Sequence, residues 1–428
     1  MITDAHLLNA ITEIEAKSST LTVLHVAPIN KPIRPDLGYG PIESVIYNVD
    51  KGLHLAGHRS IVACSADSDV AGEHCVTVER SLGDYCREQT SEQRAIINRH
   101  LLMALERANL GDIDIIHMHG WLDLIYGGRF NPDVPIVMTL HVPAENSGMD
   151  AAQNLYFNSM LNPSMHFASI SDYQKRQYHV LDNLETIHHG INVDDYPFGG
   201  TPEKQDYLFM IGRITRDKGQ DKAIELAKRT GSKLIIAGCV QDKAEDREFL
   251  NTLKNSIDLF ADIGKAPVDG AYYDNVMKPL LDSGKQLIYI GESSSAQKKQ
   301  WYRHARATLF PIQWGEPFGL VLLESMACGT PVLAFRKGAV PEIVVDGKTG
   351  FTVDTLDEMI AAAGHISLLD PADCRRHVEN HFSTFSMAGK YSELYQRIIS
   401  MGRLRHTEVR TGAGFPEVLQ PILAGGTV

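Results

Sequence analysis

The 428-residue sequence lacks the features of membrane-spanning, nucleic-acid-binding and disulfide-rich proteins. No apolar run approaches the ~18–20 residues of a membrane span. The first twenty residues carry Lys17 as their only base, so we expect no secretory leader. The net charge of −12 argues against a bulk nucleic-acid binder, which needs a basic surface. The six cysteines show no CxxC spacing, and we therefore expect reduced thiols in a soluble, cytoplasmic protein. Peripheral contact with a membrane stays open.

Short β-branched runs alternate with longer amphipathic stretches along the chain, which is typical of parallel sheets wrapped by helices. In the first half, the expected strands are 21–28, 59–65, 114–120, 135–141, 166–171 and 185–190. After a polar stretch at 193–205 that contains proline and glycine, the alternation restarts with 206–212, 232–238, 286–291, 307–312, 330–335 and 351–353. The sequence therefore predicts an α/β protein with two βα-type domains rather than one sheet of a dozen strands.

A loop after the expected strand 206–212 carries two cations, Arg213 and Lys218. Ligands of open α/β sheets gather at the carboxyl ends of the strands. An arginine fork and a lysine point charge in that place suit a diphosphate. The alternative is a solvated basic loop in which Asp217 and Asp221 are the partners of these cations.

Two glutamates, Glu316 and Glu324, bracket the apolar stretch PFGLVLL. Pro317 favours a helix start, and we expect a helix over about 317–328. The backbone N–H groups at its start, those of Phe318, Gly319 and Leu320, would then favour an anion. Glu324 either faces water or faces a ligand, because a buried carboxylate needs polar partners. A diphosphate flanked by hydroxyl groups, as in a nucleotide sugar, matches this layout.

Two glycines, Gly38 and Gly40, follow the first expected strand and precede a helix expected at 42–57. This pattern fits either a tight turn or a phosphate contact. It is not a dinucleotide fingerprint, because position 43 is glutamate where a third glycine is needed.

The run PIQWGEPFGLVLLESMACGTPVLAFRKGAVPEIVVDGKTGFTV (311–353) resembles the donor-site signature of the retaining glycosyltransferases of family four, which have the GT-B fold. IGRITRDKG (211–219) and HGINVDDYPF (189–198) are similar to two further blocks of that family. GYGPIE (38–43), DIIHMHG (114–120) and TLHVP (139–143) match weaker amino-terminal landmarks. Position 189 departs from the family, which commonly has asparagine or another polar residue there.

The resemblance implies two Rossmann-like domains that face each other across a cleft. They would be an acceptor-binding domain at 1–195 and a nucleotide-sugar donor-binding domain at 196–384. The segment 385–428 would hold a helix that crosses back to the first domain, and a tail. In that helix, Met387, Tyr391, Leu394 and Ile398 share one face.

The resemblance also implies a role for each matched residue. Arg213 and Lys218 would bind the diphosphate and stabilise the leaving group, and Glu316 would bind hydroxyls of the transferred sugar beside the main chain of 318–320. Glu324 would bind the ribose. The remaining expected contacts are Gly38 and Gly40 to the phosphates, His141 to the transferred sugar, and His119 and Trp121 to the acceptor.

Other polar clusters allow a metal as the alternative. Asp67-Ser-Asp69 and Asp112-Ile-Asp114 imitate an Asp-x-Asp metal motif, and His117 and His119 share one strand face. Because Arg213, Lys218 and a helix dipole already suit a diphosphate, we expect neither a catalytic metal nor a resident cofactor.

The expected activity is therefore transfer of a hexosyl group from a nucleotide sugar, UDP-linked by family frequency, to an acceptor hydroxyl with retention of configuration. The alternatives are a nucleotide-sugar epimerase or a catalytically silent binding protein of the same fold. A phosphorylase would need pyridoxal phosphate on a lysine, and no stretch suggests that site.

Overall fold

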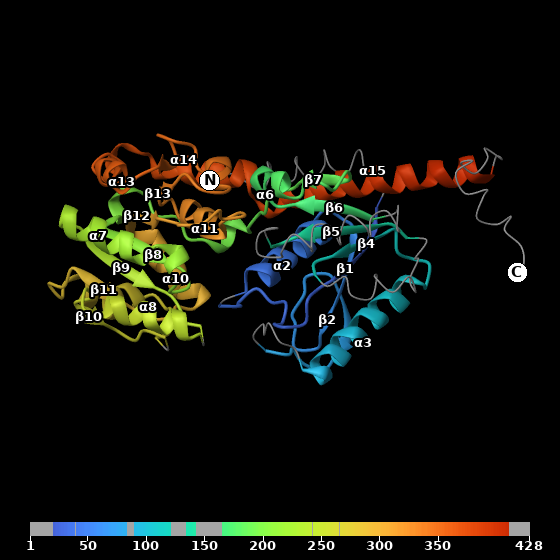
Figure 1. Cartoon of the computed structure of the whole chain (residues 1–428), viewed down its shortest axis with the longest axis horizontal. Coiled ribbons are helices and arrows are strands. Elements are labelled where there is room, and N and C mark those ends of the chain that lie inside the picture. Colours follow the sequence, from blue (N-terminus) through green and yellow to red (C-terminus); the bar gives the residue numbers. More distant parts are fainter. Residues whose placement is uncertain are drawn as a thin grey trace, which may run out of the picture.

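The computed structural model describes residues 20–38, 40–83, 90–120, 134–142, 165–241, 243–264 and 266–410, without the side chains of 402–410. Two α/β lobes stand side by side, and one long helix runs from the second lobe along the first (Figure 1). This is the expected two-domain architecture. No helix of the described part is long and apolar enough to cross a membrane.

The first lobe is built on a parallel sheet in the order β3-β2-β1-β4-β5-β6-β7. Its strands are β1 (Thr22–Val26), β2 (Arg59–Ser65), β3 (Glu73–Val78), β4 (Ile115–Met118), β5 (Ile136–Leu140), β6 (Met165–Ser169) and β7 (Leu184–Thr186). Its helices are α2 (Pro41–Leu55), α3 (Ser91–Ala108) and α6 (Asp172–Gln177). The strand order reverses between β1 and β4, where open α/β sheets commonly bind ligands.

The second lobe repeats this design with the parallel order β10-β11-β9-β8-β12-β13-β14. Its strands are β8 (Gln205–Ile211), β9 (Lys233–Ala237), β10 (Leu259–Phe260), β11 (Leu287–Tyr289), β12 (Ala305–Phe310), β13 (Val332–Phe335) and β14 (Gly350–Val353). Its α-helices are α7 (Gln220–Thr230), α8 (Ala244–Lys254), α9 (Lys278–Leu281), α10 (Ser295–His304), α11 (Leu320–Ala327), α12 (Val340–Ile343), α13 (Leu356–Ala363) and α14 (Pro371–His381). Short helical turns lie at η2 (Val193–Asp195), η3 (Thr201–Glu203), η4 (Arg216–Lys218), η5 (Tyr273–Met277) and η6 (Ile366–Leu368).

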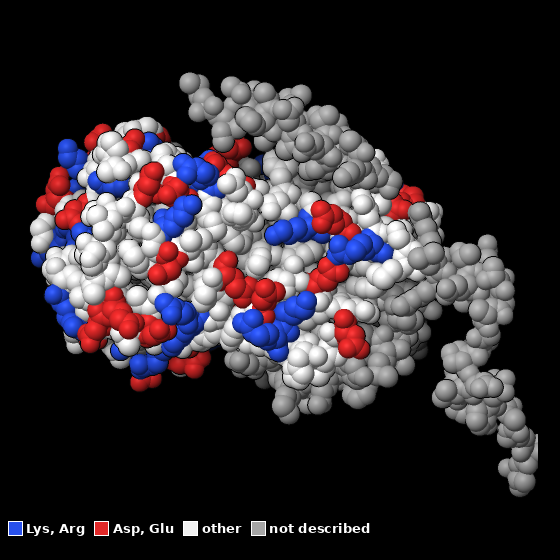
Figure 2. Space-filling model, turned by 90° about the horizontal axis from the view of Figure 1, so that it is seen from above, with Lys and Arg blue, Asp and Glu red and all other residues white. Residues whose placement is uncertain are grey.

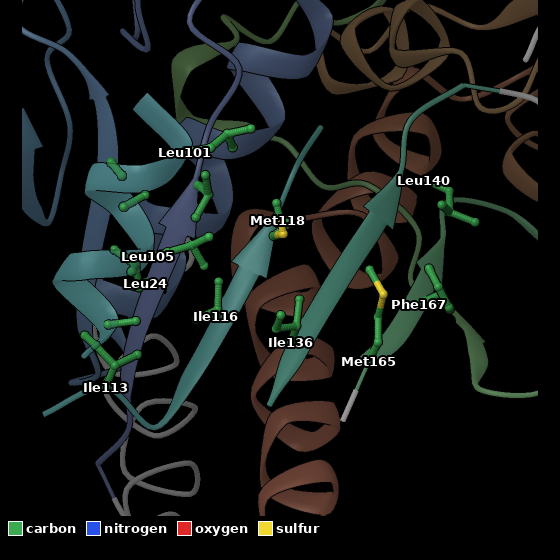
Figure 3. Packing of buried hydrophobic residues seen from close by; sticks show 14 of the residues in the cluster. Leu24, Leu101, Leu105, Ile113, Ile116, Met118, Ile136, Leu140, Met165 and Phe167 are labelled. Atoms are coloured by element: carbon green, nitrogen blue, oxygen red, sulfur yellow. The ribbon is translucent and has the colours of Figure 1, made fainter. Parts of the chain in front are cut away.

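Alternation along the strands of the first sheet divides its apolar side chains between two layers. Leu24 and Ile116 pack with Leu101 and Leu105 of α3 on one face (Figure 3). Val23 and Ile115, each one position before a residue that faces α3, pack on the opposite face, against α2 and the final helix. This period of two is the ordinary pleat of a β-strand.

The final helix, α15 (Thr384–Arg410), leaves the second lobe and packs on the first, as expected for a helix that crosses back. Its buried face consists of Met387, Ala388, Tyr391, Leu394, Tyr395 and Ile398. These residues cover Val23, Ile115 and Val137 of the sheet and contact α2. The side chains at 25, 117 and 139, two positions further along these strands, therefore also lie under this helix.

Two strands were missing from the sequence-based expectation, and both are at sheet edges. β3 is largely exposed along its length, and β10 has only two residues. Neither has the apolar run that identifies a buried strand. On the face shown in Figure 2, basic and acidic side chains are interspersed.

Candidate active site

The cleft between the lobes contains a pocket of about 340 Å³ at the carboxyl ends of strands from both sheets. We call it the Glu316 pocket. Segments that follow β8 and β12 supply one wall, including Arg213, Lys218 and Glu316, and His141 after β5 supplies the other. The strand order of the second sheet reverses between β8 and β12. The pocket therefore lies at the switch point where such sheets bind ligands.

Lys218 meets a carboxylate instead of water. Its Nζ lies 2.7 Å from Oε2 of Glu316 and stands 5.6 Å from the ring centre of Trp314. The turn that carries Lys218 ends at Gly219, whose φ of 76° and close approach to the carbonyl of Pro311 leave no room for a Cβ. The lysine and the glutamate are thereby held together in the lining of the pocket.

Arg213 follows β8 in the same pocket, and its Nη1 donates a 3.0 Å hydrogen bond to Oε1 of Gln241. The predicted proximity of Arg213, Lys218 and Glu316 is thus present. The alternative partners, Asp217 and Asp221, do not pair with either cation among the described ion pairs, in which Asp221 contacts Lys222.

The helix after Glu316 begins three residues later than expected. α11 starts at Leu320, and Gly319 precedes it with a φ of 99°. Residues 317–319 form a loop because Gly319 adopts the left-handed conformation, which interrupts helical geometry. The donors of the first turn are therefore the N–H groups of Leu320 and Val321, which line the pocket. The side chain of Phe318 is buried, so only its main chain can serve a ligand.

Glu324 is buried, which excludes the reading in which it faces water. Its Oε1 lies 2.5 Å from Nζ of Lys298 and accepts a 3.3 Å hydrogen bond from Tyr196, and its Oε2 accepts a 3.2 Å bond from Tyr302. Burial, and then the nearby carboxylate, raises the pKa of both phenols well above the usual value. Both phenols therefore keep their protons and donate to Glu324.

A second pocket, of about 140 Å³, surrounds Glu324, and we call it the Glu324 pocket. Both predicted glycines, Gly38 and Gly40, line it from the first lobe. Gly40 immediately precedes α2, so the N-terminus of that helix also faces the cleft. Pro41, Leu320 and Val321 line both pockets, so the two adjoin at the starts of α2 and α11.

His141 lies in the Glu316 pocket, but His119 is placed differently from its expected role. His119 is buried behind His141, with its Nδ1 3.2 Å from Nε2 of His141. Among the described residues, His119 lines neither pocket, and this position does not fit a direct contact with an acceptor. Trp121, the other residue expected to touch the acceptor, lies outside the described residues.

Sequence reasoning missed several polar side chains of the cleft. Lys298 and Tyr302 belong to α10, and His189, expected only as a departure from a pattern, lines the Glu316 pocket. None of them has a local signal, because their partners come from other elements of the fold. The sequence could identify Glu324 as a carboxylate that needs a partner, but not which residue supplies it.

The two acidic motifs that imitate metal sites have structural partners instead. Asp112 pairs with Arg59 and Arg107, and Asp114 accepts a hydrogen bond from the backbone N–H of Thr22. Asp67 accepts from Ser81. Within the described part of the chain, the one group with metal-compatible spacing is His25, His117 and His119, all buried.

Two adjoining pockets hold two helix N-termini, two cations and two carboxylates, which is the chemistry expected for a diphosphate that carries hydroxyl-bearing groups on both sides. Two Rossmann-like domains around a shared cleft are the GT-B architecture. Comparison with known proteins then gives the family.

The profile of the family described as "Glycosyl transferases group 1" matches residues 195–382, and that of "Glycosyltransferase Family 4" matches residues 42–195. Together they span both lobes. The chain belongs to the family-four glycosyltransferases.

A curated relative, a D-inositol 3-phosphate glycosyltransferase of Mycolicibacterium smegmatis, is 26% identical over 340 residues, which cover 69% of this chain and 70% of the relative. Two solved structures are similar at lower sequence identity. Sucrose-phosphate synthase from Thermosynechococcus elongatus has a TM-score of 0.67 at 17% identity and covers 89% of this chain and 100% of its own. Anabaena Alr3699/HepE, solved in complex with UDP, has a TM-score of 0.61 at 15% identity and covers 88% and 100%. The latter two likenesses support the fold.

Proposed function

We propose that this protein transfers a hexosyl group from a UDP-sugar to a hydroxyl of an acceptor, with retention of anomeric configuration and without a metal or resident cofactor. The observation that carries the proposal is the arrangement of Lys218 and Glu316 in one pocket and Glu324 in the next, on either side of the start of α11. We further propose that the reaction takes place in the cytoplasm, in keeping with the thiols of the described cysteines, which are free.

The proposed position of the diphosphate is the junction of the two pockets. Leu320 and Val321, whose N–H groups begin α11, line both pockets there, and Arg213 and Lys218 supply positive charge from the Glu316 pocket. Charge of this kind, fixed before the reaction, stabilises a departing diphosphate. Because these groups can supply the stabilisation themselves, we propose that no divalent cation is required.

The two carboxylates then contact the hydroxyl groups on either side of the diphosphate. In our proposal the sugar occupies the Glu316 pocket and the ribose binds near Glu324, which is already surrounded by donors. Ribose hydroxyls would replace the Lys298 contact or share the carboxylate with it. Gly38 and Gly40 let the first lobe approach the same ligand.

Retention follows in this proposal without an attacking carboxylate. Glu316 is the single carboxylate among the described residues that line its pocket, and Lys218 holds it. A double displacement by two carboxyl groups would need them about 5–5.5 Å apart, as in retaining hydrolases. The bond from the anomeric carbon to the diphosphate oxygen breaks, the acceptor oxygen forms its bond on the same face, and the departing oxygen takes the acceptor proton.

The donor and acceptor classes rest on the comparisons. Structural neighbours were solved with UDP and with ADP, so the likenesses support a nucleoside diphosphate donor, and we propose uridine as the base to test first. The named activity of the Mycolicibacterium relative makes D-inositol 3-phosphate the first acceptor to test. We propose an acceptor of this kind, a polyol or sugar with a free hydroxyl.

The test is a transfer assay with UDP-, GDP- and ADP-hexoses, an acceptor panel that includes D-inositol 3-phosphate, and EDTA throughout. The expected result is release of UDP that depends on the acceptor, together with a product heavier by one hexosyl unit. Conversion of one UDP-sugar to another without acceptor would instead show an epimerase, and binding without turnover would show a silent protein. Faster turnover with GDP or ADP, or loss of activity in EDTA, would refute the base or the metal independence.

A further inference from the structure

Four histidines form a continuous row from the core of the first lobe to the Glu316 pocket. Nδ1 of His25 lies 3.2 Å from Nε2 of His119, and Nδ1 of His119 lies 3.2 Å from Nε2 of His141. The ring of His189 then stacks on His141, with the centres 5.6 Å apart. The two contacts between ring nitrogens are within hydrogen-bond distance.

The register and the pleat of the parallel sheet bring these histidines together. His25 of β1 stands opposite His117 of β4 in the strand register, and His119 lies two positions beyond His117. His141 follows the end of β5, the next strand in the sheet. The row therefore crosses the strand ends at the reversal point of the first sheet and leads into the cleft.

A metal ion is the first alternative for these rings, because His25, His117 and His119 have suitable spacing. His117, however, already uses both ring nitrogens. Its Nε2 lies 2.7 Å from Oγ1 of Thr139, and its Nδ1 lies 2.7 Å from the hydroxyl of Tyr395. A metal would have to break one of these contacts. We therefore treat the row as hydrogen-bonded imidazoles.

The row is neutral when the protein is folded. Burial lowers the pKa of His25 and of His141 to about 3, and it lowers the pKa of His119 well below the usual value. A neutral imidazole carries one N–H and one bare nitrogen. Each contact between rings needs one of each, so the protons of His25, His119 and His141 must all point in the same direction along the row.

One end of the row decides this direction. Nε2 of His25 is buried and has no hydrogen-bond partner among the described residues. If the protons pointed inward, this nitrogen would be a buried N–H without an acceptor, which is rare in proteins. If they point toward the cleft, it is a bare nitrogen, and His25 and His119 each donate through Nδ1.

We propose that His25 and His119 are positioning residues that hold His141 as a hydrogen-bond donor, through its Nδ1–H, toward the sugar in the Glu316 pocket. His141 uses Nε2 for His119, which leaves Nδ1 for a ligand. Near-parallel rings flank His141, because the ring centre of His119 lies 5.5 Å away and that of His189 lies 5.6 Å away. His189 in turn meets the ring of Phe318, just before α11.

This inference rests on the proposed function for the identity of the ligand, but its first test needs no transfer. Long-range ¹H–¹⁵N NMR of histidine-labelled protein reports which nitrogen of each ring carries the proton. The expected result is a neutral His141 protonated at Nδ1 and bare at Nε2, with the same tautomer for His25 and His119. A His141 protonated at Nε2 would overturn the proposed direction.

Variants of the buried end give the second test. His25→Asn places an amide donor near the former Nδ1, whereas His25→Leu has no donor. We expect His25→Leu to lower kcat about five- to tenfold, the loss expected of one hydrogen bond, with the asparagine variant close to wild type. Both should bind UDP like wild type, because UDP lacks the sugar that His141 contacts.

His100→Leu is the matched control, because His100 is buried in the same lobe and bonds to Thr77 and the carbonyl of Ala27 outside the row. It should keep the wild-type kcat once folded. Equal kcat values for His25→Leu and wild type would contradict the proposal. So would the finding that the wild-type protein binds one zinc ion per chain and that His25→Asn binds none. If NMR shows the expected tautomers but no acceptor supports UDP release, the proposed function is refuted and the proposed proton direction along the histidine row is confirmed.

Discussion

Nζ of Lys218 lies 2.7 Å from Oε2 of Glu316, although the two residues are 98 positions apart in the chain. The cation assigned to the diphosphate thus holds the carboxylate assigned to the sugar hydroxyls. On the proposed assignment, loss of either side chain would disturb both the diphosphate contact and the sugar contact.

We predict that Lys218→Gln lowers kcat by ~10²-fold or more, as does the loss of one preorganised donor to a developing anion. Steady-state kinetics with saturating donor measures this. Lys222→Gln is the control, because Lys222 is a half-buried lysine close in sequence that pairs only with Asp221 among the described ion pairs. Full activity of Lys218→Gln would refute its role in leaving-group stabilisation.

Glu324→Gln should act mainly on donor binding. The carboxylate is buried among Lys298, Tyr196 and Tyr302 and is proposed to meet the ribose rather than the reacting carbon. We expect the donor KM to rise about tenfold with a smaller change in kcat, the pattern of a lost uniform-binding contact. Calorimetry with UDP should show the same weakening, and Glu225→Gln, an exposed change on α7, should not. A loss confined to kcat would place Glu324 at the chemical step instead.

Two glycines give a matched pair of backbone tests. Gly338 and Gly347 both have left-handed φ values, 62° and 69°. A Cβ at Gly338 would stand 2.2 Å from the carbonyl oxygen of Glu316, whereas one at Gly347 meets nothing within 4 Å. Both alanine variants should lose about 1 kcal/mol of stability through backbone strain. Gly338→Ala should lose more, because its Cβ meets the main chain of Glu316, and it alone should displace Glu316 and lose most activity. Equal kcat values for the two folded variants would contradict this geometry.

The buried histidines make stability depend on pH. The pKa of His25 is lowered from its ordinary value of 6.5 to about 3 in the folded protein, because burial disfavours the charged ring. At pH values between the folded and the unfolded pKa, the unfolded chain binds a proton on His25 and the folded protein does not. The stability that the neutral ring contributes is therefore complete above pH 6.5 and is lost as the pH falls. From pH 7 to pH 5, the loss for this one histidine is about 2 kcal/mol.

Urea unfolding at pH 7 and pH 5 measures the effect. In His25→Asn, the difference in unfolding free energy between the two pH values should be smaller than in wild type by about this amount. His54→Asn, an exposed change on α2, should leave the difference as it is. If the difference in unfolding free energy between the two pH values is the same in His25→Asn as in wild type, the pKa of His25 is not lowered in the folded protein.

Most of the fold could be predicted from the sequence, because buried parallel strands are continuous apolar runs between amphipathic helices. β3 and β10 could not, because edge strands carry little apolar surface. The cations and carboxylates of the site follow strand ends and a helix start, so their proximity was predictable. The partners of Glu324, the late start of α11 and the place of His25 depend on contacts between distant segments, which no local pattern encodes.

The central claim, transfer from a nucleotide sugar with retention and without a carboxylate nucleophile, is tested most directly by the anomeric configuration of the product. The measurement is the anomeric proton coupling in ¹H NMR of the product formed from a UDP-α-hexose and the acceptor found in the transfer assay. The account predicts an α-linked product, with the configuration of the donor. A β-linked product would contradict it.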